Sequence, residues 1–210
     1  MTRILLLSPH TDDVELGCGG SVAKFIEEGN EILWIPFSVA EDSLPTGLPK
    51  DTLAYEFKKV MECYGLSEKS YEILGYQVRH MDRYRQEILE HLVRIRRDFS
   101  PEIVIGPSVN DHHQDHQVVA NEMIRAFKSS SSIICYELPW NHVRFDTQLF
   151  VTLTEEHMNR KWQALQEYRS QIIGNKGYFD REFIFGAARL RGVQCNQRYA
   201  EAFEVVRWRM

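Results

Sequence analysis

Short apolar runs alternate with stretches of helical periodicity along most of the chain. Continuous apolar runs of strand length occupy residues 4–7, 31–38, 103–105 and 133–138. Such runs are typical of strands that are buried on both faces of a parallel sheet. Three weaker segments also favour extended structure. They are residues 71–74, 149–153 and 202–208, the last of them as a strand or an extended tail.

Apolar residues at helical spacing follow most of these runs. The predicted helices cover residues 22–26, 54–64, 84–99, 118–127, 158–172 and 183–190. Gly65 and Pro101 end two of them, and glycines at 174 and 177 end another. The alternation predicts an α/β protein with a mostly parallel sheet and helices on both faces. No repeat or linker divides the chain, so residues 1–210 are expected to form a single domain.

Composition excludes several classes of partner. The chain has 43% hydrophobic and 26% charged residues, a net charge of -5 and no basic block, which argues against nucleic acid and anionic membrane as partners. The opening apolar run is too short for a signal peptide, and no run reaches membrane length. The four cysteines are widely separated, as in a reduced chain, so we expect a cytoplasmic protein. Composition does not exclude a homo-oligomer.

Residues 8–20 carry the first polar cluster, directly after the first predicted strand. His10 and Asp13 suit a divalent metal, and Asp12 could then act as a base on bound water. The glycines up to residue 20 are expected to allow the irregular backbone on which these side chains converge. Two alternatives compete: a helix N-cap rich in aspartate, and a dinucleotide loop. The G-x-G-G spacing does not match the G-x-G-x-x-G of such loops.

Residues 106–116 carry the second cluster, directly after the strand at 103–105. Three histidines and two aspartates occur within six positions here, and His113 and His116 share one face of the following helix. The first strand and the strand at 103–105 would flank the switch point of a doubly wound sheet, where ligands bind. The two clusters are therefore expected to meet in space.

The combined clusters predict a catalytic metal site. His10, Asp13 and His116 supply two imidazoles and one carboxylate, which leaves a position open for water. Zinc is the default for this donor set, although iron or cobalt would also fit it. Zinc lowers the pKa of its bound water to about 7 in favourable sites.

Three further residues complete a hydrolytic mechanism for an amide or ester. Asp12 would take the proton of the water as general base. His113 would stabilise an oxyanion or protonate the leaving amine, with the ring oriented by Asp115.

The two motifs resemble those of a known family, the PIG-L/LmbE-like N-deacetylases, which includes the N-acetylglucosaminyl-phosphatidylinositol de-N-acetylases. Residues 10–20 resemble its H-P-D-D-E-x-x-x-G-G signature, and residues 113–116 its H-x-D-H signature. Residues 161–171 and 199–203 extend the resemblance over essentially the whole chain. Thr11 replaces the usual proline and Val14 the usual glutamate.

The resemblance implies a Rossmann-like fold and zinc-dependent removal of an acetyl group from an N-acetylglucosamine-type sugar or sugar conjugate. By matching position it gives the metal ligands, the base Asp12 and the supporting pair His113 and Asp115 the same roles as above. Several family members place a substrate-binding arginine early in the second helix. Arg79 could replace it here, or could equally be a solvated surface residue.

Residues that follow the strand at 133–138 could line the sugar site. Trp140 and His142 are the candidates, and Trp140 could equally belong to the core. Glu201 matches a family position, but no role for it follows from the sequence.

Two other classes of function stay open. Two histidines and one carboxylate also describe a non-haem iron oxygenase, although the strand–helix alternation argues against that class. A non-catalytic sugar-binding module on the same fold is the second alternative. The presence of Asp12 beside a full ligand set argues against it.

Overall fold

One six-stranded sheet organises the protein in the computed structural model, which describes residues 1–174 and 176–209. The strand order is β2-β1-β3-β4-β6-β5. The first four strands are parallel, and β6 runs antiparallel to both of its neighbours. The strands are β1 (Arg3–His10), β2 (Glu31–Ser38), β3 (Ile103–Gly106), β4 (Ser132–Tyr136), β5 (Leu149–Leu153) and β6 (Tyr199–Arg207). The mostly parallel α/β sheet predicted from the apolar runs is confirmed.

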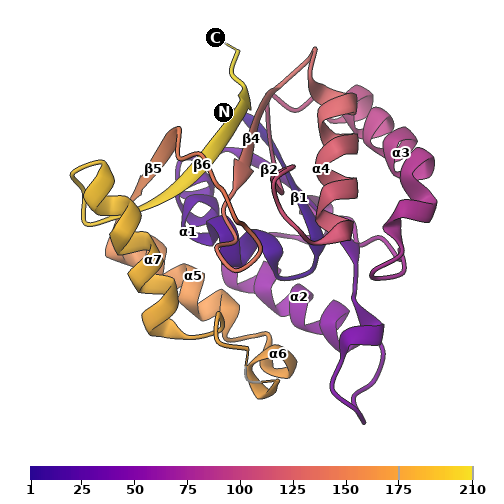
Figure 1. Ribbon diagram of the computed structural model, residues 1–210, viewed down its shortest axis with the longest axis horizontal. Coiled ribbons are helices and arrows are strands. Elements are labelled where there is room, and N and C mark those ends of the chain that lie inside the picture. Colours follow the sequence, from indigo (N-terminus) through magenta and orange to yellow (C-terminus); the bar gives the residue numbers. More distant parts are fainter. Residues whose placement is uncertain (175, 210) are drawn as a thin grey trace.

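Helices cover both faces of this sheet, as Figure 1 shows. They are α1 (Asp13–Glu27), α2 (Thr52–Tyr64), α3 (Arg85–Asp98), α4 (Gln114–Phe127), α5 (Glu155–Leu165), α6 (Arg169–Ile173) and α7 (Arg181–Gln194), with short 3-10 turns at Glu41–Ser43, Glu68–Ser70 and Met81–Tyr84. Successive residues of β1 point to opposite faces, so Leu5 and Leu7 pack under α3 and α4, whereas Ile4 and Leu6 pack under α1 and α2. No helix within the described residues is both long enough and apolar enough to span a membrane.

The segment predicted as a strand at 71–74 is not one. Its N–H groups donate to β2, from Glu72 to the carbonyl of Trp34 (3.0 Å) and from Leu74 to the carbonyl of Pro36 (2.8 Å), and a single bridge pairs Trp34 with Tyr71. Pro36 has no N–H to return, so a regular ladder cannot form along this edge.

The helix predicted over residues 158–172 is two helices. The chain turns between α5 and α6, where Tyr168 adopts φ -78° and ψ 59°. The turn places the Tyr168 hydroxyl 2.6 Å from the carbonyl of Thr11. For the segment at 202–208 the strand alternative is confirmed, because residues 202–207 belong to β6, an inner strand of the sheet.

The glycines of the first motif belong to α1 and not to an irregular turn, because the helix begins at Asp13. They permit close packing. A Cβ atom on Gly17 would lie 2.5 Å from the Tyr136 ring, and one on Gly20 would lie 2.6 Å from Leu153. Only the interruption at Cys18 (φ -148°, ψ 27°) departs from helical geometry.

A buried ion pair satisfies the backbone groups that this interruption frees. The Lys161 ammonium donates to the carbonyl of Leu16 at 2.8 Å and to Glu201 at 2.7 Å. Glu201 in turn accepts from the N–H groups of Gly20 (3.1 Å) and Ser21 (2.7 Å). Glu201 therefore caps the second half of α1, a structural role that the sequence did not indicate.

Candidate metal centre

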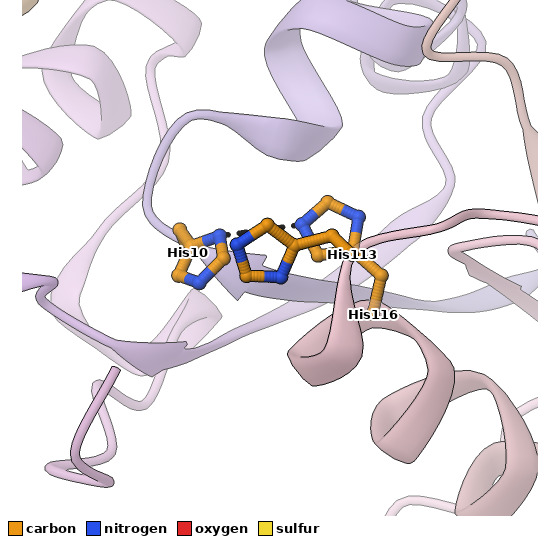
Figure 2. Close-up of side chains that lie close together, drawn as sticks. All are labelled: His10, His113 and His116. Carbon is orange, nitrogen blue, oxygen red and sulfur yellow. Dashed lines mark hydrogen bonds between the residues drawn. The ribbon is translucent and has the colours of Figure 1, made fainter. Parts of the chain in front are cut away.

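The two polar clusters meet beyond the carboxyl ends of β1 and β3, as the switch-point argument predicted. His10 ends β1, His113 is the N-cap of α4, and His116 lies in the first turn of α4. Figure 2 shows these three imidazoles close together, with a contact between His10 and His116. The sheet places β1 directly beside β3, which brings the loop after each strand to one edge.

Three donor atoms form an almost equilateral triangle. Oδ2 of Asp13 lies 3.3 Å from Nδ1 of His10 and 3.3 Å from Nε2 of His116. The two imidazole nitrogens are also 3.3 Å apart. Ligands of a tetrahedral zinc with bonds of about 2.0–2.1 Å lie roughly 3.3 Å from one another. The donor set therefore fits one face of a small tetrahedral cation.

A second pair of carboxylates holds the far side of each ligand imidazole. Nε2 of His10 lies 3.1 Å from Asp115, and Nδ1 of His116 lies 2.7 Å from Asp111. Each far nitrogen donates to its carboxylate in the neutral ring, so the near nitrogens carry lone pairs that face Asp13. This arrangement is typical of metal-binding histidines. Asp111 went unassigned in the sequence, although it belongs to the same six-residue cluster.

The electrostatics of the triangle favour a cation. Burial lowers the pKa of both imidazoles, but Asp13 and the outer carboxylates outweigh burial. They raise the pKa of His10 to about 9 and that of His116 to about 10. Burial raises the pKa of Asp13, yet His116 and His10 hold it well below its usual range. Either protons or a metal ion must therefore occupy the space between these groups.

His113 is the third imidazole of the site and is neutral. Its ring centroid lies 4.8 Å from that of His10 and 4.7 Å from that of His116. Burial, together with the charge of His10 and then of His116, lowers its pKa to about 4. Its Nδ1 accepts the backbone N–H of Asp115 at 3.2 Å, which leaves the ring proton on Nε2. With His10 and His116 it forms a second ligand set, within which all donor atoms lie within 4.8 Å of one another.

The carboxylate of Asp115 does not orient His113, contrary to the sequence-based expectation. It accepts from His10 and from the backbone N–H groups of Arg79 (2.6 Å) and Met81 (3.3 Å). Asp115 orients His113 only through its own backbone N–H. The reason is local geometry, because Asp115 lies in the first turn of α4 and its side chain points back toward β1.

Asp12 is the N-cap of α1, but its carboxylate makes no capping hydrogen bond. Asp12 thus takes the position that the cap interpretation gave it, but its side chain does not cap the helix. The side chain lines a cleft together with the ligand residues. Burial raises the pKa of Asp12, and the neighbouring charge of Asp13 raises it further. A buried carboxylate with a raised pKa beside a metal triangle is suited to accept a proton.

Two of the three predicted substrate contacts line this cleft. Arg79 lies on one wall with a left-handed backbone (φ 67°), and its guanidinium contacts the carbonyl of Asp42 at 3.4 Å. Trp140 lies on another wall and stacks on Tyr178, with ring centroids 4.1 Å apart and planes 9° apart. His142 lies outside the cleft, in a neighbouring hollow.

The segment after α5 supplies a wall that no sequence pattern indicated. Gln171, Lys176 and Tyr178 all line the cleft. The Lys176 ammonium donates to Gln171 at 2.5 Å. These residue types occur on many surfaces, so only their position relative to the two clusters marks them.

The chain resembles several known proteins. It is 24% identical over 169 residues to the uncharacterized deacetylase YaiS of Escherichia coli strain K12, a match that covers 80% of this chain and 90% of that one. Its fold matches N,N'-diacetylchitobiose deacetylase from Pyrococcus horikoshii with a TM-score of 0.81 and 19% identity, over 98% of this chain and 84% of that one.

A third neighbour has a different chemistry. The 4-carboxy-2-hydroxymuconate hydratase GalB from Pseudomonas putida KT2440 matches with a TM-score of 0.82 and 21% identity, over 100% of this chain and 98% of that one. At these identities the structural matches establish the fold alone.

The family model described as PIG-L, GlcNAc-PI de-N-acetylase, matches residues 5–127. This range includes both motifs and every donor atom of the triangle. It covers more than half of the chain. On that evidence the chain belongs to the PIG-L family.

Proposed function

We propose that this protein is a metal-dependent N-deacetylase that removes the acetyl group from an N-acetylated amino sugar or its conjugate. The observation that carries the proposal is the triangle of His10, Asp13 and His116 with the unbonded carboxylate of Asp12 beside it. Membership of the PIG-L family supports the reaction class. The resemblance to the uncharacterized deacetylase YaiS supports deacetylation, and the structural likeness to N,N'-diacetylchitobiose deacetylase supports a sugar substrate.

His10, Asp13 and His116 would hold the metal, and zinc is the default for two imidazoles and one carboxylate. When bound, such an ion supplies Lewis-acid activation of water and of the acyl oxygen. The outer carboxylates Asp115 and Asp111 keep both imidazoles in the ligating tautomer.

Asp12 acts as general base in this mechanism. Its carboxylate accepts the proton of the water that attacks the acetyl carbon and can later deliver that proton to the leaving nitrogen. Burial and the charge of Asp13 raise its pKa, which strengthens it as a base. The absence of a capping bond leaves its oxygens available for this transfer.

His113 supplies a hydrogen-bond donor for the developing oxyanion. Its low pKa keeps the ring neutral, and the N–H of Asp115 on Nδ1 places the ring proton on Nε2. This N–H donor is already in place before the reaction, so no reorganisation is needed when negative charge develops on the acyl oxygen. Trp140 and Arg79 on the cleft walls would contact the sugar and its substituents.

The first test combines metal content with acetate release from acetylated amino sugars. We expect about one divalent ion per chain, loss of the ion in His116→Ala, and retention of the ion in Asp12→Asn. Asp12→Asn should lower kcat by about 10²–10⁴-fold, since it removes the general base. Asp51→Asn is the matched control, because Asp51 is also an N-cap without a side-chain cap bond and lies away from the metal triangle.

Other outcomes would contradict the proposal in distinct ways. Full activity in Asp12→Asn would remove the base assignment. Metal binding with tight sugar binding but no acetate release would favour the binding module. Oxygen uptake with a cosubstrate would favour the oxygenase. The hydratase neighbour shows that this fold also carries other water chemistry, so acetate itself must be the measured product.

A further inference from the structure

The carboxylate of Asp12 makes no hydrogen bond to another residue within the described chain. Its position must therefore come from the backbone of the two-residue turn, Thr11 and Asp12, that joins β1 to α1. A base that is misplaced by 1 Å can lose about 10²-fold in rate. What holds this turn thus matters for the chemistry.

Tyr168 holds the turn from a distant part of the chain. Its side chain is fully buried, and its hydroxyl lies 2.6 Å from the carbonyl oxygen of Thr11 and 2.7 Å from Oε1 of Glu15. It is the only described side chain that bonds to the backbone of Thr11 or Asp12. The residue lies at the turn between α5 and α6, where its own backbone departs from helical geometry.

The bond reaches Asp12 through a rigid group. The carbonyl of Thr11 and the N–H of Asp12 belong to one planar peptide unit, so fixing the carbonyl fixes the N–Cα bond of Asp12. On the other side, the carbonyl of Asp12 accepts the N–H of Leu16 at 3.0 Å, the first bond of α1. Both peptide planes beside the Asp12 Cα are therefore held, one by α1 and the other by Tyr168.

Two other hydrogen bonds close the turn, from the His10 N–H to Asp13 at 2.7 Å and from the Val14 N–H to the Ser8 hydroxyl at 3.3 Å, but neither contacts the Thr11–Asp12 peptide. The hydroxyl of Thr11 and Oε2 of Glu15 are both buried without a partner in the described chain. Buried polar atoms are usually paired, and these two contribute no hydrogen bond that could hold the turn. Loss of the Tyr168 hydroxyl would free the Thr11–Asp12 peptide to rotate.

We propose that Tyr168 is a positioning residue for Asp12 that acts through the Thr11–Asp12 peptide. The inference rests on the proposed role of Asp12 as general base. Tyr168 lies just before α6, in the same part of the chain as the cleft-lining residues Gln171, Lys176 and Tyr178. The position of the general base would thus depend on this part of the chain. Tyr168 itself lines no part of the cleft.

Tyr168→Phe tests the proposal, with Tyr64→Phe as the matched control. Tyr64 is also fully buried, and its hydroxyl donates at 3.1 Å to the carbonyl of Gly19 within α1. We expect Tyr168→Phe to lower kcat about 10–100-fold while KM and metal content stay unchanged. Tyr64→Phe should lower the melting temperature similarly and leave kcat unchanged.

A structural readout separates this inference from the proposed function. A crystal structure of Tyr168→Phe should show the Asp12 carboxylate displaced relative to Asp13. An unchanged Asp12 would overturn the inference whatever the substrate proves to be. Equal loss of kcat in both tyrosine variants would also overturn it, because the effect would then be general destabilisation. Absence of acetate release from the wild-type protein would instead contradict the proposed function.

A second variant keeps the test decisive should Tyr168→Phe fail to fold. Glu15→Met removes the other partner of the Tyr168 hydroxyl and leaves the tyrosine in place. The single O–H proton of Tyr168 then has the Thr11 carbonyl as its remaining acceptor, so the expected result is unchanged kcat, KM and metal content. A fall in kcat of about 10–100-fold in a folded, metal-loaded Glu15→Met protein would overturn the proposal, because the bond to Thr11 is still present in that variant.

Discussion

The aspartates of this site have different roles, which depend on the groups that their carboxylate oxygens contact. Asp13 points between two imidazoles, and Asp12, its neighbour in sequence, makes no such contact. Asp111 and Asp115 bond the far nitrogens of the same imidazoles. Their pKa values follow these surroundings, since cations lower the pKa of Asp13 whereas burial and an anion raise that of Asp12.

Removing the charge of an outer carboxylate should weaken metal binding without removing a ligand. Asp115→Asn and Asp111→Asn are each expected to lower metal affinity about 10–100-fold, because the amide cannot hold the imidazole N–H as strongly. Competition with a chromogenic chelator measures the affinity, and Asp51→Asn is the control. Unchanged affinity in both variants would contradict the outer-carboxylate role.

Metal binding should also be coupled to protons at the ligand imidazoles. The pKa of His10 is about 9 and that of His116 about 10 in the metal-free chain, so a metal must displace protons below these pH values. We expect affinity to rise between pH 6 and pH 9, with about two protons released per ion near pH 7. Calorimetry in buffers of different ionisation enthalpy counts the protons, and a release near zero would contradict the assignment.

Helix α1 is the element on which the site depends, because it begins at the ligand Asp13 and is interrupted five residues later. The Lys161–Glu201 pair satisfies the backbone at that interruption. The pair is buried on both sides, so removal of one partner would leave an uncompensated charge.

Glu201→Ala should therefore destabilise the fold strongly, by about 3–5 kcal/mol. The double variant Lys161→Met with Glu201→Met should lose less than the sum of the single changes, since neither charge stays unpaired. Urea unfolding measures the free energies. Lys59→Met, which breaks an exposed pair with Glu62, is the control and should change little. Equal effects at both pairs would contradict the capping role.

Gly17→Ala should also destabilise the protein, because the added Cβ would lie 2.5 Å from the Tyr136 ring. Overpacking of this kind costs about 1–3 kcal/mol. Gly186→Ala is the matched control, since Gly186 lies in α7 with open space around it and should gain helix propensity. Melting temperatures of the two variants should move in opposite directions, and a stable Gly17→Ala would remove the packing argument.

At the scale of the whole molecule, the sheet separates two hydrophobic core clusters, one on each of its faces. One cluster of core residues lies between the sheet and α1, α2 and α5, and the other lies between the sheet and α3 and α4. The metal ligands come from the sheet strand β1, from α1 on one face of the sheet and from α4 on the other. A bound ion therefore connects elements that pack on opposite faces.

Metal loading should accordingly stabilise the folded protein as a whole. Binding to the native state alone stabilises it by about 2.7 kcal/mol at a hundredfold excess over Kd. In the metal-free chain, the raised pKa values of His10 and His116 contribute stability that is full below about 6.5 and is lost as pH rises through about 9 to 10. The gain in melting temperature on zinc addition should thus be larger at pH 8 than at pH 6. A gain that falls over this range would contradict the linkage.

The apolar pattern predicted much of the fold for a plain reason. Strands buried on both faces must be apolar throughout, and helices over them must carry an apolar stripe. The pattern failed where an interaction outside the segment decided the outcome. Pro36 broke the ladder beside residues 71–74, and the turn at Tyr168, whose hydroxyl bonds to Thr11, divides the helix predicted over residues 158–172.

The sequence by itself determined the chemical types and their meeting place. Two polar clusters after adjacent parallel strands must lie at one sheet edge, and that condition predicted the triangle of His10, Asp13 and His116. Tertiary structure alone decided which carboxylate faces which imidazole, why Gly17 and Gly20 leave no room for a side chain, and what Glu201 and Tyr168 contact. Several of those roles depend on contacts between residues far apart in sequence, with 105 positions between His10 and Asp115, 157 between Thr11 and Tyr168 and 181 between Gly20 and Glu201. Hydrogen bonds form or fail over a few tenths of an ångström, a distance that residue type and spacing do not specify.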